Sequence, residues 1–444
     1  MRRKEQLSLD RSPAGHQHAE ELEQIGQIVD ANPRMAELVE QDLLRGVENP
    51  GTGARGLTGD QVLRILLIKQ MNGFSYEELA FHLADSVTYR AFCRFGALEK
   101  TPARSTLSEN LKKVRSETLE AVEQRLVGWA VERKIEKGRK VRIDATVTES
   151  NIHAPTDSLL LLDGVRVLLR LLRRAGEHFD VGHFSDHRKR AKRRALAIQH
   201  TLSAKKRRGA YRDLLKVAKK TVSYAELGAE RLESVSGEVA SCLVAELRQV
   251  VELVGMVIDQ TERRVLHGES VPASEKVVSL FEPHTDIIVK DRRETLYGHK
   301  VYLTAGASGL ILDCVVVDGN PADSTMTVPL LERQKRILGV VPRQAAFDGG
   351  FASKDNLCDA KTLGVEDVAF SKKRGLEVSE MTRSSWVYRR LRNFRAGIEG
   401  LISFLKRAFG LDRCTWRGAE SFASYVHASV LAANFLTLAR HLMA

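Results

Sequence analysis

The stretch KVRIDATV, residues 140–147, is where the pattern of the chain changes from helix to strand. Its β-branched residues have the spacing of a buried strand, with Asp144 at its end. Residues 56–136 before it carry apolar side chains at helical spacing, with capping-box signatures at Ser75 and at Thr106. The stretch therefore predicts the first strand of a sheet that follows a wholly helical segment.

Strand patterns return in the C-terminal half of the chain. They are DIIVK, HKVYLTAG and LILDCVVVDG within residues 286–319, RQAAFDGGF at 343–351 and VEDVAFS at 365–371. Residues 156–262 have long helical periodicity with few Gly or Pro, and further helices are expected at 326–338 and at the C-terminus. These patterns predict an α/β fold with a mixed sheet, a helical N-terminal domain and a long helical insertion.

A chain of 444 residues is too long for one compact core, so several domains are expected. We predict a polar N-terminal arm with short helices at 1–55, a helical domain at 56–136, an α/β domain formed by 137–155 and 276–444, and a helical insertion at 156–275. Short helices with tight turns in the helical domain are compatible with a helix-turn-helix module and equally with a plain helical bundle.

Composition excludes several classes of protein. Hydrophobic residues make up 43% of the chain, but no run of about 18 apolar residues is uninterrupted, so no membrane-spanning helix is expected. The basic N-terminus has no apolar stretch and does not resemble a secretory signal. The five cysteines are scattered without a C-x-x-C pair, which indicates a reduced, intracellular protein without a structural zinc.

The formal net charge of +12 is concentrated in one window. Residues 185–220 contain 14 Lys and Arg against two Asp, and the two signs balance in the rest of the chain. The window includes Arg188, Lys189, Arg190, Lys192, Arg193, Arg194, Lys205, Lys206, Arg207 and Arg208. This concentration is typical of a surface that binds a polyanion, although charge runs also occur on solvated faces. A membrane surface is disfavoured because the window lacks an apolar face rich in Trp and Phe.

Two aspartates follow strand patterns, Asp144 in the first strand and Asp348 in AAFDGGF. In an open α/β sheet, residues at the carboxyl ends of strands line the functional crevice, and a helix over that edge can add a third ligand such as Glu399. Three oxygen ligands without a nearby His or Cys set favour Mg²⁺ or Mn²⁺ over zinc. Two such ions, about 3.5–4 Å apart, would activate a water and stabilise the leaving oxygen of a phosphodiester.

Glu399 belongs to an amphipathic helix pattern, FRAGIEGLISFLKRAFGL, residues 394–411. Arg395 precedes it by four residues and Lys406 follows it by seven, so the three charges share one helical stripe. A carboxylate between two cations can bind a divalent metal while its neighbours hold phosphates. An exposed, ion-paired stripe has the same spacing, so the metal interpretation depends on the two aspartates.

Several alternatives remain open for single residues. A lone strand-end aspartate is more often a turn cap than a ligand. Glu377 and Glu380 are rival third ligands, but they lack the flanking cations at helical spacing. Asp323 follows a Gly-Asn-Pro turn and is expected to be a turn residue. Trp386 and Trp416 are expected to pack in a core, with stacking on a DNA base as the alternative.

Taken together, the motifs resemble those of bacterial insertion-sequence transposases of the DDE class, in particular the ISNCY-type group. LTGDQVLRILLIKQMNGFSYEELAFHLADSVTYRAFCRFG is similar to the N-terminal helical domain that several of these families share. RIDATVTESNIHAPTDSLLL is similar to the first-aspartate motif at Asp144, and AAFDGGF to the second at Asp348. YGHKVYL and VVVDGNPADS resemble the next two strands.

The third motif of these transposases is Tyr, two residues, Arg, three residues, Glu, six residues and Lys. Arg395, Glu399 and Lys406 have this spacing, but Arg392 stands at the tyrosine position. The arginine at this position affects the contact with phosphate or the stacking that the tyrosine provides in related transposases. It does not affect the prediction that Glu399 is a metal ligand.

The resemblance implies an RNase H-like sheet of the retroviral-integrase type, interrupted by the basic insertion. Asp144, Asp348 and Glu399 would be the catalytic ligands of Mg²⁺ or Mn²⁺, with two ions expected. Arg392, Arg395 and Lys406 would contact DNA, as would the cations of residues 185–220. The helical domain would bind the terminal inverted repeats of the element. The partner would be double-stranded DNA, bound by a homodimer at the bacterial nucleoid in the cytoplasm.

The expected reaction is metal-dependent cleavage of the transposon end, followed by strand transfer of the freed 3′-hydroxyl to target DNA. One alternative is a metal-dependent nuclease that cuts without joining. A second is a regulator that binds DNA and has lost catalysis.

Overall fold

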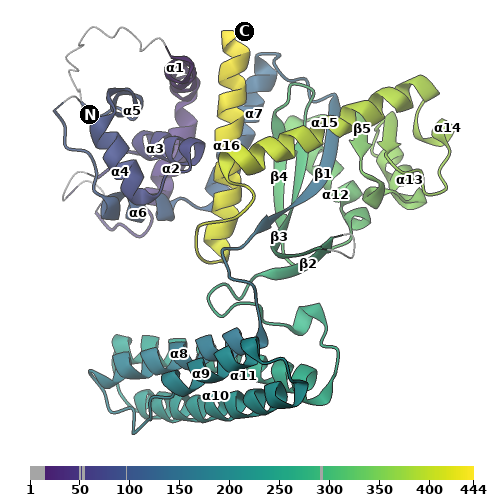
Figure 1. Ribbon diagram of the computed structural model, residues 1–444. Helices are drawn as coiled ribbons and strands as arrows, with labels where there is room; N and C mark the ends of the chain where they lie inside the picture. The colour runs from purple at the N-terminus through teal and green to yellow at the C-terminus, as the bar shows by residue number, and fades with distance from the viewer. Residues whose placement is uncertain (1–15, 50–51, 53–55, 97, 291–293) are drawn as a thin grey trace. The chain divides into compact units, whose positions relative to one another are not determined.

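The computed structural model describes residues 16–49, 52, 56–96, 98–290 and 294–444 (Figure 1). These form two compact units, one of residues 1–149 with 299–444 and the other of residues 150–298. The basic N-terminal residues and most of the NPGTGARG segment lie outside the described residues. All five cysteines are free, as the sequence predicts.

The first unit contains a mixed sheet, which confirms the predicted α/β class. Its strands are β1 (Lys140–Glu149), β3 (Glu294–Ala305), β4 (Ile311–Val317), β5 (Gln344–Phe347) and β6 (Asp367–Phe370). β1 is central, with β5 and then β6 parallel on one side. β3 is its other neighbour and pairs antiparallel with β4. Parallel strands buried on both faces explain the nearly continuous apolar runs in β5 and β6.

Seven helices precede β1 in the described chain. They are α1 (Gln17–Asp30), α2 (Pro33–Leu43), α3 (Gly59–Asn72), α4 (Tyr76–Asp85), α5 (Val87–Phe92), α6 (Arg104–Lys113) and α7 (Ser116–Glu132). The capping box at Ser75 is present at the start of α4. The predicted cap at Thr106 is wrong, because α6 begins at Arg104 with Ala103 as its N-cap, so Thr106 lies inside the helix.

Helices α1 and α2 fall within residues 1–55, where a polar arm was expected. Both are amphipathic, and their apolar faces, including Ile25 and Val39, are buried in the same core as the sheet. α2 packs closely on the start of α3, where a Cβ on Gly59 would collide with the carbonyl oxygen of Ala36. The described part of this segment is therefore integral to the first unit, because its apolar stripe has a partner surface.

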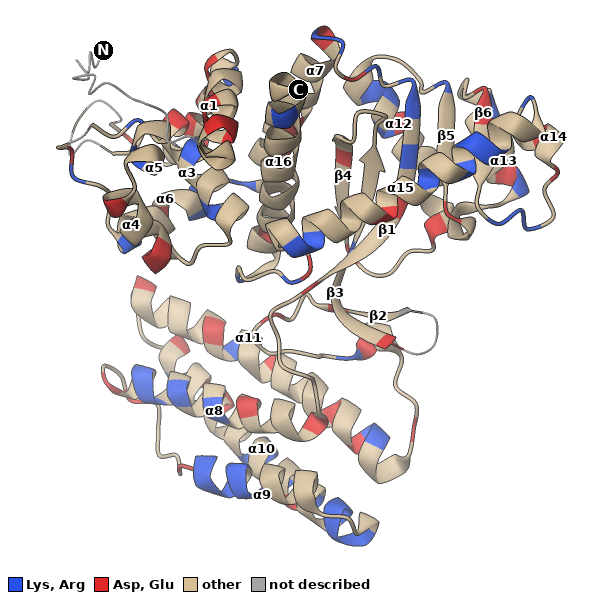
Figure 2. Ribbon diagram, turned by 45° about the horizontal axis from the view of Figure 1, so that its top comes forward, with Lys and Arg blue, Asp and Glu red and all other residues tan. Residues whose placement is uncertain are grey.

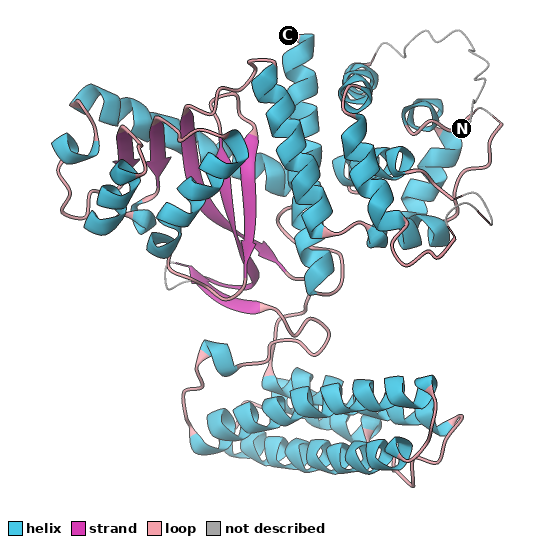
Figure 3. Ribbon diagram, turned by 180° about the vertical axis from the view of Figure 1, so that it is seen from behind, coloured by secondary structure: helices cyan, strands magenta, loops and turns pink. Residues whose placement is uncertain are grey.

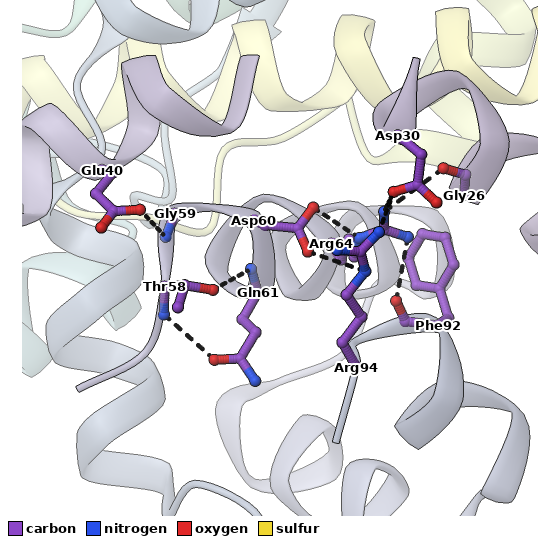
Figure 4. A network of polar contacts seen from close by, with 10 residues as sticks. All are labelled: Gly26, Asp30, Glu40, Thr58, Gly59, Asp60, Gln61, Arg64, Phe92 and Arg94. Atoms are coloured by element: carbon purple, nitrogen blue, oxygen red, sulfur yellow. Dashed lines mark hydrogen bonds and ion pairs between the residues drawn. The ribbon is translucent and has the colours of Figure 1, made fainter. Parts of the chain in front are cut away.

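A buried arginine joins α1, α3 and α5 (Figure 4). Arg64 is only 3% exposed and donates to Asp60 at 2.9 Å and to Asp30 at 2.5 Å. It also donates to the carbonyl oxygen of Phe92 at 3.3 Å. Arg94 pairs with the same two aspartates. Since a buried charge is tolerated only when paired, this network fixes how the N-terminal helices pack.

Five helices lie after β4 in the chain. α12 (Asp323–Leu338) follows β4 and α13 (Lys354–Thr362) follows β5. After β6 come α14 (Val378–Met381), α15 (Ser385–Phe409) and α16 (Ala419–Met443). α15 packs against β1, β5 and β6 (Figure 1). α16, which ends at the C-terminus marked in Figure 3, packs against α1, α3, α7 and β4. By length and composition α16 resembles a membrane-spanning helix, but 89% of its apolar window is buried in the protein. The all-round apolar character of α16 is that of a core helix.

The second unit is mainly helical and has its own core. It contains α8 (Asp157–Gly176), α9 (Arg188–His200), α10 (Ala204–Glu233) and α11 (Glu238–Thr261), followed by a π-helical turn at Glu262–His267. Leucines such as Leu168, Leu214 and Leu247 fill the space between these helices. The short strand β2 (Asp286–Lys290) pairs antiparallel with residues 294–298, the first part of β3. The helical insertion predicted at 156–275 matches the span of these helices, and its domain boundaries remain a proposal.

Candidate active site

Strand register places Asp144 and Asp348 side by side. Ile143 of β1 pairs with Phe347 of β5, and each aspartate is the next residue in its strand direction. The sequence pattern suggested that the first strand ends at Asp144. This is wrong, because β1 continues to Glu149. β5 stops at Phe347, however, so its pairing with β1 ends at Ile143 and Asp144 has no partner in β5. Both aspartates therefore lie where the parallel pairing ends.

The third parallel strand adds a residue that the sequence analysis missed. Phe347 also pairs with Phe370 of β6, so Ser371 follows in the same row as the two aspartates. The Ser371 hydroxyl donates to Asp348 Oδ1 at 2.7 Å. The pattern VEDVAFS predicts the strand. It does not predict the contact of Ser371 with Asp348, because that contact depends on the register between β5 and β6.

Helix α15 is held across the sheet by contacts from β1. Arg142 donates to the carbonyl oxygen of Phe394 at 3.1 Å, and its guanidinium lies 4.8 Å from the centre of the Phe394 ring. A Cβ on Gly397 would collide with Arg142 Nη1, so glycine is needed for this approach. α15 also contacts β6, where the Tyr388 hydroxyl donates to the carbonyl oxygen of Phe370 at 2.9 Å. These contacts set which residues of α15 reach the two aspartates.

Arg395 is the residue of α15 that reaches both aspartates. Its Nη2 lies 2.8 Å from Asp144 Oδ2 and 3.3 Å from Asp348 Oδ1. Its Nη1 donates to Glu399 Oε1 at 2.8 Å, one helical turn further along α15. One guanidinium, itself 16% exposed, therefore pairs with all three carboxylates that the sequence analysis selected.

The two aspartates differ in their electrostatic environment. Burial, helped by the nearby charge of Asp348, raises the pKa of Asp144 above its ordinary value even though Arg395 opposes the shift. Burial would also raise the pKa of Asp348, but hydrogen bonds from Ser371 and Gly349, with the charge of Arg395, outweigh it and lower that pKa. The carboxylates repel each other, and Arg395 offsets that repulsion.

The two glycines of AAFDGGF allow charged side chains to approach the backbone that follows Asp348. A Cβ on Gly349 would meet Lys372 Cβ at 2.7 Å, and one on Gly350 would meet Asp323 Oδ2 at 2.7 Å. Asp323 is the first residue of α12 and pairs with Lys300 at 3.1 Å. Asp323 is therefore not the turn residue that was expected from the sequence. It begins a helix and forms an ion pair.

Other residues of the third motif lie away from the carboxylates. Lys406 pairs with Asp412 at 3.3 Å, near the C-terminal end of α15. The guanidinium of Arg392 lies 6.0 Å from the centre of the Tyr388 ring. Glu377 and Glu380 form the capping box of α14, which accounts for both without a metal. Among the described residues, no cluster of three or more His, Cys, Asp or Glu is arranged to hold a metal ion.

The two tryptophans differ in exposure. Trp416 is half-buried, with its ring 5.6 Å from that of Tyr425, in agreement with a packing role. Trp386, near the start of α15, is 57% exposed, so the expectation that it packs in a core is wrong.

The basic window lies on α9 and the first turns of α10 (Figure 2). Some of its cations are already neutralised: Arg190 and Arg194 both pair with Asp213. Arg188 pairs with Asp186, while Arg207 and Arg208 donate to backbone carbonyl groups. In the described chain, Lys189, Lys192, Arg193, Lys205 and Lys206 are exposed and form no ion pair.

Two protein families match the chain. The family "Transposase DDE domain" matches residues 258–435, and "Transposase domain (DUF772)" matches residues 8–113. Together they cover more than half of the sequence. The chain belongs to the DDE transposases of insertion sequences. No curated protein and no solved structure matches the transposase.

The DDE match includes Asp348 and Glu399 but begins after Asp144. Helices α8, α9 and α10 and most of α11 lie between Asp144 and the first matched residue in the chain. The DUF772 match includes α1 to α6, and therefore also the helices in the segment expected to be a polar arm. Membership of the transposase in the ISNCY-type group remains a prediction.

Proposed function

We propose that Asp144, Asp348 and Glu399 form the catalytic site at which this transposase cuts the ends of its element and joins them to target DNA. The observation that carries the proposal is the single guanidinium of Arg395 paired with all three carboxylates. We further propose that the sheet is RNase H-like. The order β3, β1, β5, β6, with β4 antiparallel to β3, supports that assignment.

The donor set fits a hard divalent cation such as Mg²⁺ or Mn²⁺. Asp144 Oδ2 and Asp348 Oδ1 both lie within 3.3 Å of one cationic nitrogen, so they already share a position of positive charge. Carboxylate oxygens are the ligands that these ions prefer. One or two bound ions would supply Lewis-acid activation of the attacking oxygen and stabilisation of the leaving oxygen.

The residues of the chain prepare this site for DNA. Ser371 and the Gly349 N–H orient Asp348 and keep it ionised. Arg395 holds the carboxylates together and presents a planar guanidinium to a phosphate. Glu399, 65% exposed, is placed to complete the ligand set from the helix side.

DNA would also be held outside the catalytic site. The helical domain of residues 56–136 is the proposed reader of the inverted repeats, and the basic window on α9 and α10 the proposed grip on the phosphate backbone. A homodimer would hold two transposon ends together. We propose that the protein acts at the nucleoid in the bacterial cytoplasm.

The test is cleavage of DNA that carries the ends of the element, with Mg²⁺ or Mn²⁺. Asp144→Asn, Asp348→Asn and Glu399→Gln are each expected to abolish cleavage and to leave end binding within about twofold. Glu366→Gln is the control, because Glu366 is an exposed carboxylate that pairs with Arg343 away from the site. Cleavage that survives in one of the three variants removes that residue from the catalytic set.

The alternatives give different products in the same assay. A nuclease yields cut ends but no joined product when target plasmid is added. A regulator without catalysis binds the ends and cuts nothing. Joined product from the wild-type protein supports the transposase reaction.

A further inference from the structure

Trp386 lies in the first turn of α15 with 57% of its surface exposed. An exposed indole keeps a large apolar ring in water, and a ligand that stacks on the ring would remove that area from solvent. The Arg390 guanidinium lies 4.7 Å from the centre of the Trp386 ring. The indole is thus held in place beside a cation and still presents ring surface to solvent.

A row of side chains extends from this pair to β1. Trp386, Arg390 and Phe394 are spaced four residues apart and share one face of α15. Lys140, the first residue of β1, has its Nζ 4.1 Å from the centre of the Phe394 ring. Burial, followed by the charges of Arg390 and Arg142, lowers the pKa of Lys140, so these cations lie close enough to repel one another.

No carboxylate neutralises this row within the described residues. Lys140, Arg389, Arg390 and Arg392 form no ion pair there. In the basic window, by contrast, Arg190 and Arg194 are neutralised in part because both pair with Asp213. A group of cations that repel one another and lack a counter-ion is stabilised by a bound polyanion.

We propose that this surface, Lys140, Trp386, Arg389 and Arg390, binds an unpaired segment of DNA with one base stacked on Trp386. The proposal rests on the function proposed above and names the part of the DNA that the start of α15 holds. Bases inside a duplex have no free face, so an exposed indole stacks only on a base that has left the helix or ends it. Trp386 precedes Arg395 by nine residues, about two and a half turns, so the indole lies on the side of α15 away from the carboxylates and the surface is separate from the catalytic site.

The test compares two DNAs in EDTA, so that binding is measured without cleavage. One is a fluorescein-labelled duplex of about 20 base pairs that carries an end of the element, and the other is the same duplex with a thymine tail of about six nucleotides. Fluorescence anisotropy of the full-length wild-type protein is expected to show tighter binding to the tailed DNA. Trp386→Ala should weaken binding to the tailed DNA about tenfold and to the blunt duplex less than twofold. Trp386→Phe should restore most of the loss, because phenylalanine also stacks.

The cations are tested through salt dependence. Arg389→Gln with Arg390→Gln should reduce the slope of log affinity against log salt for the tailed DNA by about 1.4, since each single-strand phosphate contact contributes about 0.7. Two matched controls should leave the tail preference unchanged. Phe281→Ala removes a similarly exposed aromatic ring in the loop before β2, and Arg343→Gln removes an exposed arginine that has a carboxylate partner.

The outcomes separate this inference from the proposed function. Wild-type protein that binds neither DNA overturns the transposase function itself. Wild-type protein that binds tailed and blunt DNA equally, with Trp386→Ala unchanged, overturns only the unpaired-DNA site. Equal weakening of both DNAs by Trp386→Ala also overturns it, because the indole would then contact duplex.

Discussion

Arg395 Nη2 and Asp144 Oδ2 lie 2.8 Å apart, although 251 residues separate them in the chain. Both side chains are mostly buried, with exposed fractions of 16% and 13%. The same nitrogen lies 3.3 Å from Asp348 Oδ1, so Arg395 occupies the position of positive charge that two neighbouring aspartates require. The Arg395 guanidinium and a divalent metal ion would therefore both favour a position beside Asp144 Oδ2 and Asp348 Oδ1.

Arg395→Gln should lower the stability of the protein in EDTA by about 2 kcal/mol, because a mostly buried, charged hydrogen bond is lost and the aspartates are left to repel each other. Addition of Mg²⁺ should raise the melting temperature of this variant more than that of the wild type, since the carboxylates no longer have a cation. Thermal unfolding with and without Mg²⁺ measures both effects. Arg343→Gln, at an exposed ion pair, is the control and should change stability by less than about 1 kcal/mol. Equal Mg²⁺ responses in Arg395→Gln and wild type would show that Arg395 and the metal do not compete.

Gly397→Ala and Gly400→Ala form a matched pair on α15. Alanine is favoured over glycine in a helix by up to about 1 kcal/mol, and a Cβ on Gly400 meets nothing within 4 Å, so Gly400→Ala should raise stability by about that amount. A Cβ on Gly397 would displace the Arg142 side chain from the carbonyl oxygen of Phe394. Gly397→Ala should therefore gain less stability than Gly400→Ala and cleave DNA more slowly. Chemical denaturation and a cleavage assay compare the two. Identical results for both variants would show that the Arg142 contact does not position α15.

Local patterns were enough to predict the strands that carry Asp144 and Asp348, and the helix that carries Arg395. They were not enough to bring these residues together. The 3.6-residue period placed Arg395 near Glu399, but its contact with the aspartates depends on where Arg142 and Gly397 fix α15 on β1. Such contacts join distant parts of the chain and leave no periodic signal in the sequence.

Other differences have the same origin. Ser371 reaches Asp348 only because β5 and β6 pair in one register. The exposure of Trp386 is equally invisible from sequence, since tryptophan is usually buried and its neighbours on α15 alternate between apolar and basic residues. Short helices are predicted within residues 1–55, but their burial is not, because their apolar faces are short and are completed by α16 and α3.

A buried pair in the core should make stability depend on pH. Glu123 of α7 and His427 of α16 lie 3.1 Å apart, and both are nearly inaccessible to solvent. Burial raises the pKa of Glu123 to about 7. Burial would lower the pKa of His427, but the Glu123 carboxylate outweighs it and raises that pKa.

Both pKa values are raised by folding, so the folded protein binds more protons than the unfolded chain between the ordinary carboxyl pKa and a pH somewhat above 7. The contribution of this pair to stability is therefore full at low pH and is lost as the pH rises through that window, with a change on the order of 2 kcal/mol. Urea denaturation of the wild type and Glu123→Gln at several pH values measures the difference. The difference between the two proteins should fall with rising pH, and a constant difference would contradict the prediction.

The ion pairs on α9 predict which cations of the basic window contribute most to duplex binding. Lys189, Lys192 and Arg193 are exposed and form no ion pair in the described chain, whereas Arg190 and Arg194 share Asp213. Neutralisation of the first three by glutamine should reduce the slope of log affinity against log salt by about 2.7, at about 0.9 for each duplex phosphate contact. Arg190→Gln with Arg194→Gln should reduce it by less than about 1.8, because Asp213 already offsets part of their charge. Anisotropy titrations of a blunt duplex over a range of salt concentrations measure both slopes. Equal loss per cation in the two variants would show that Asp213 releases its arginines when DNA binds.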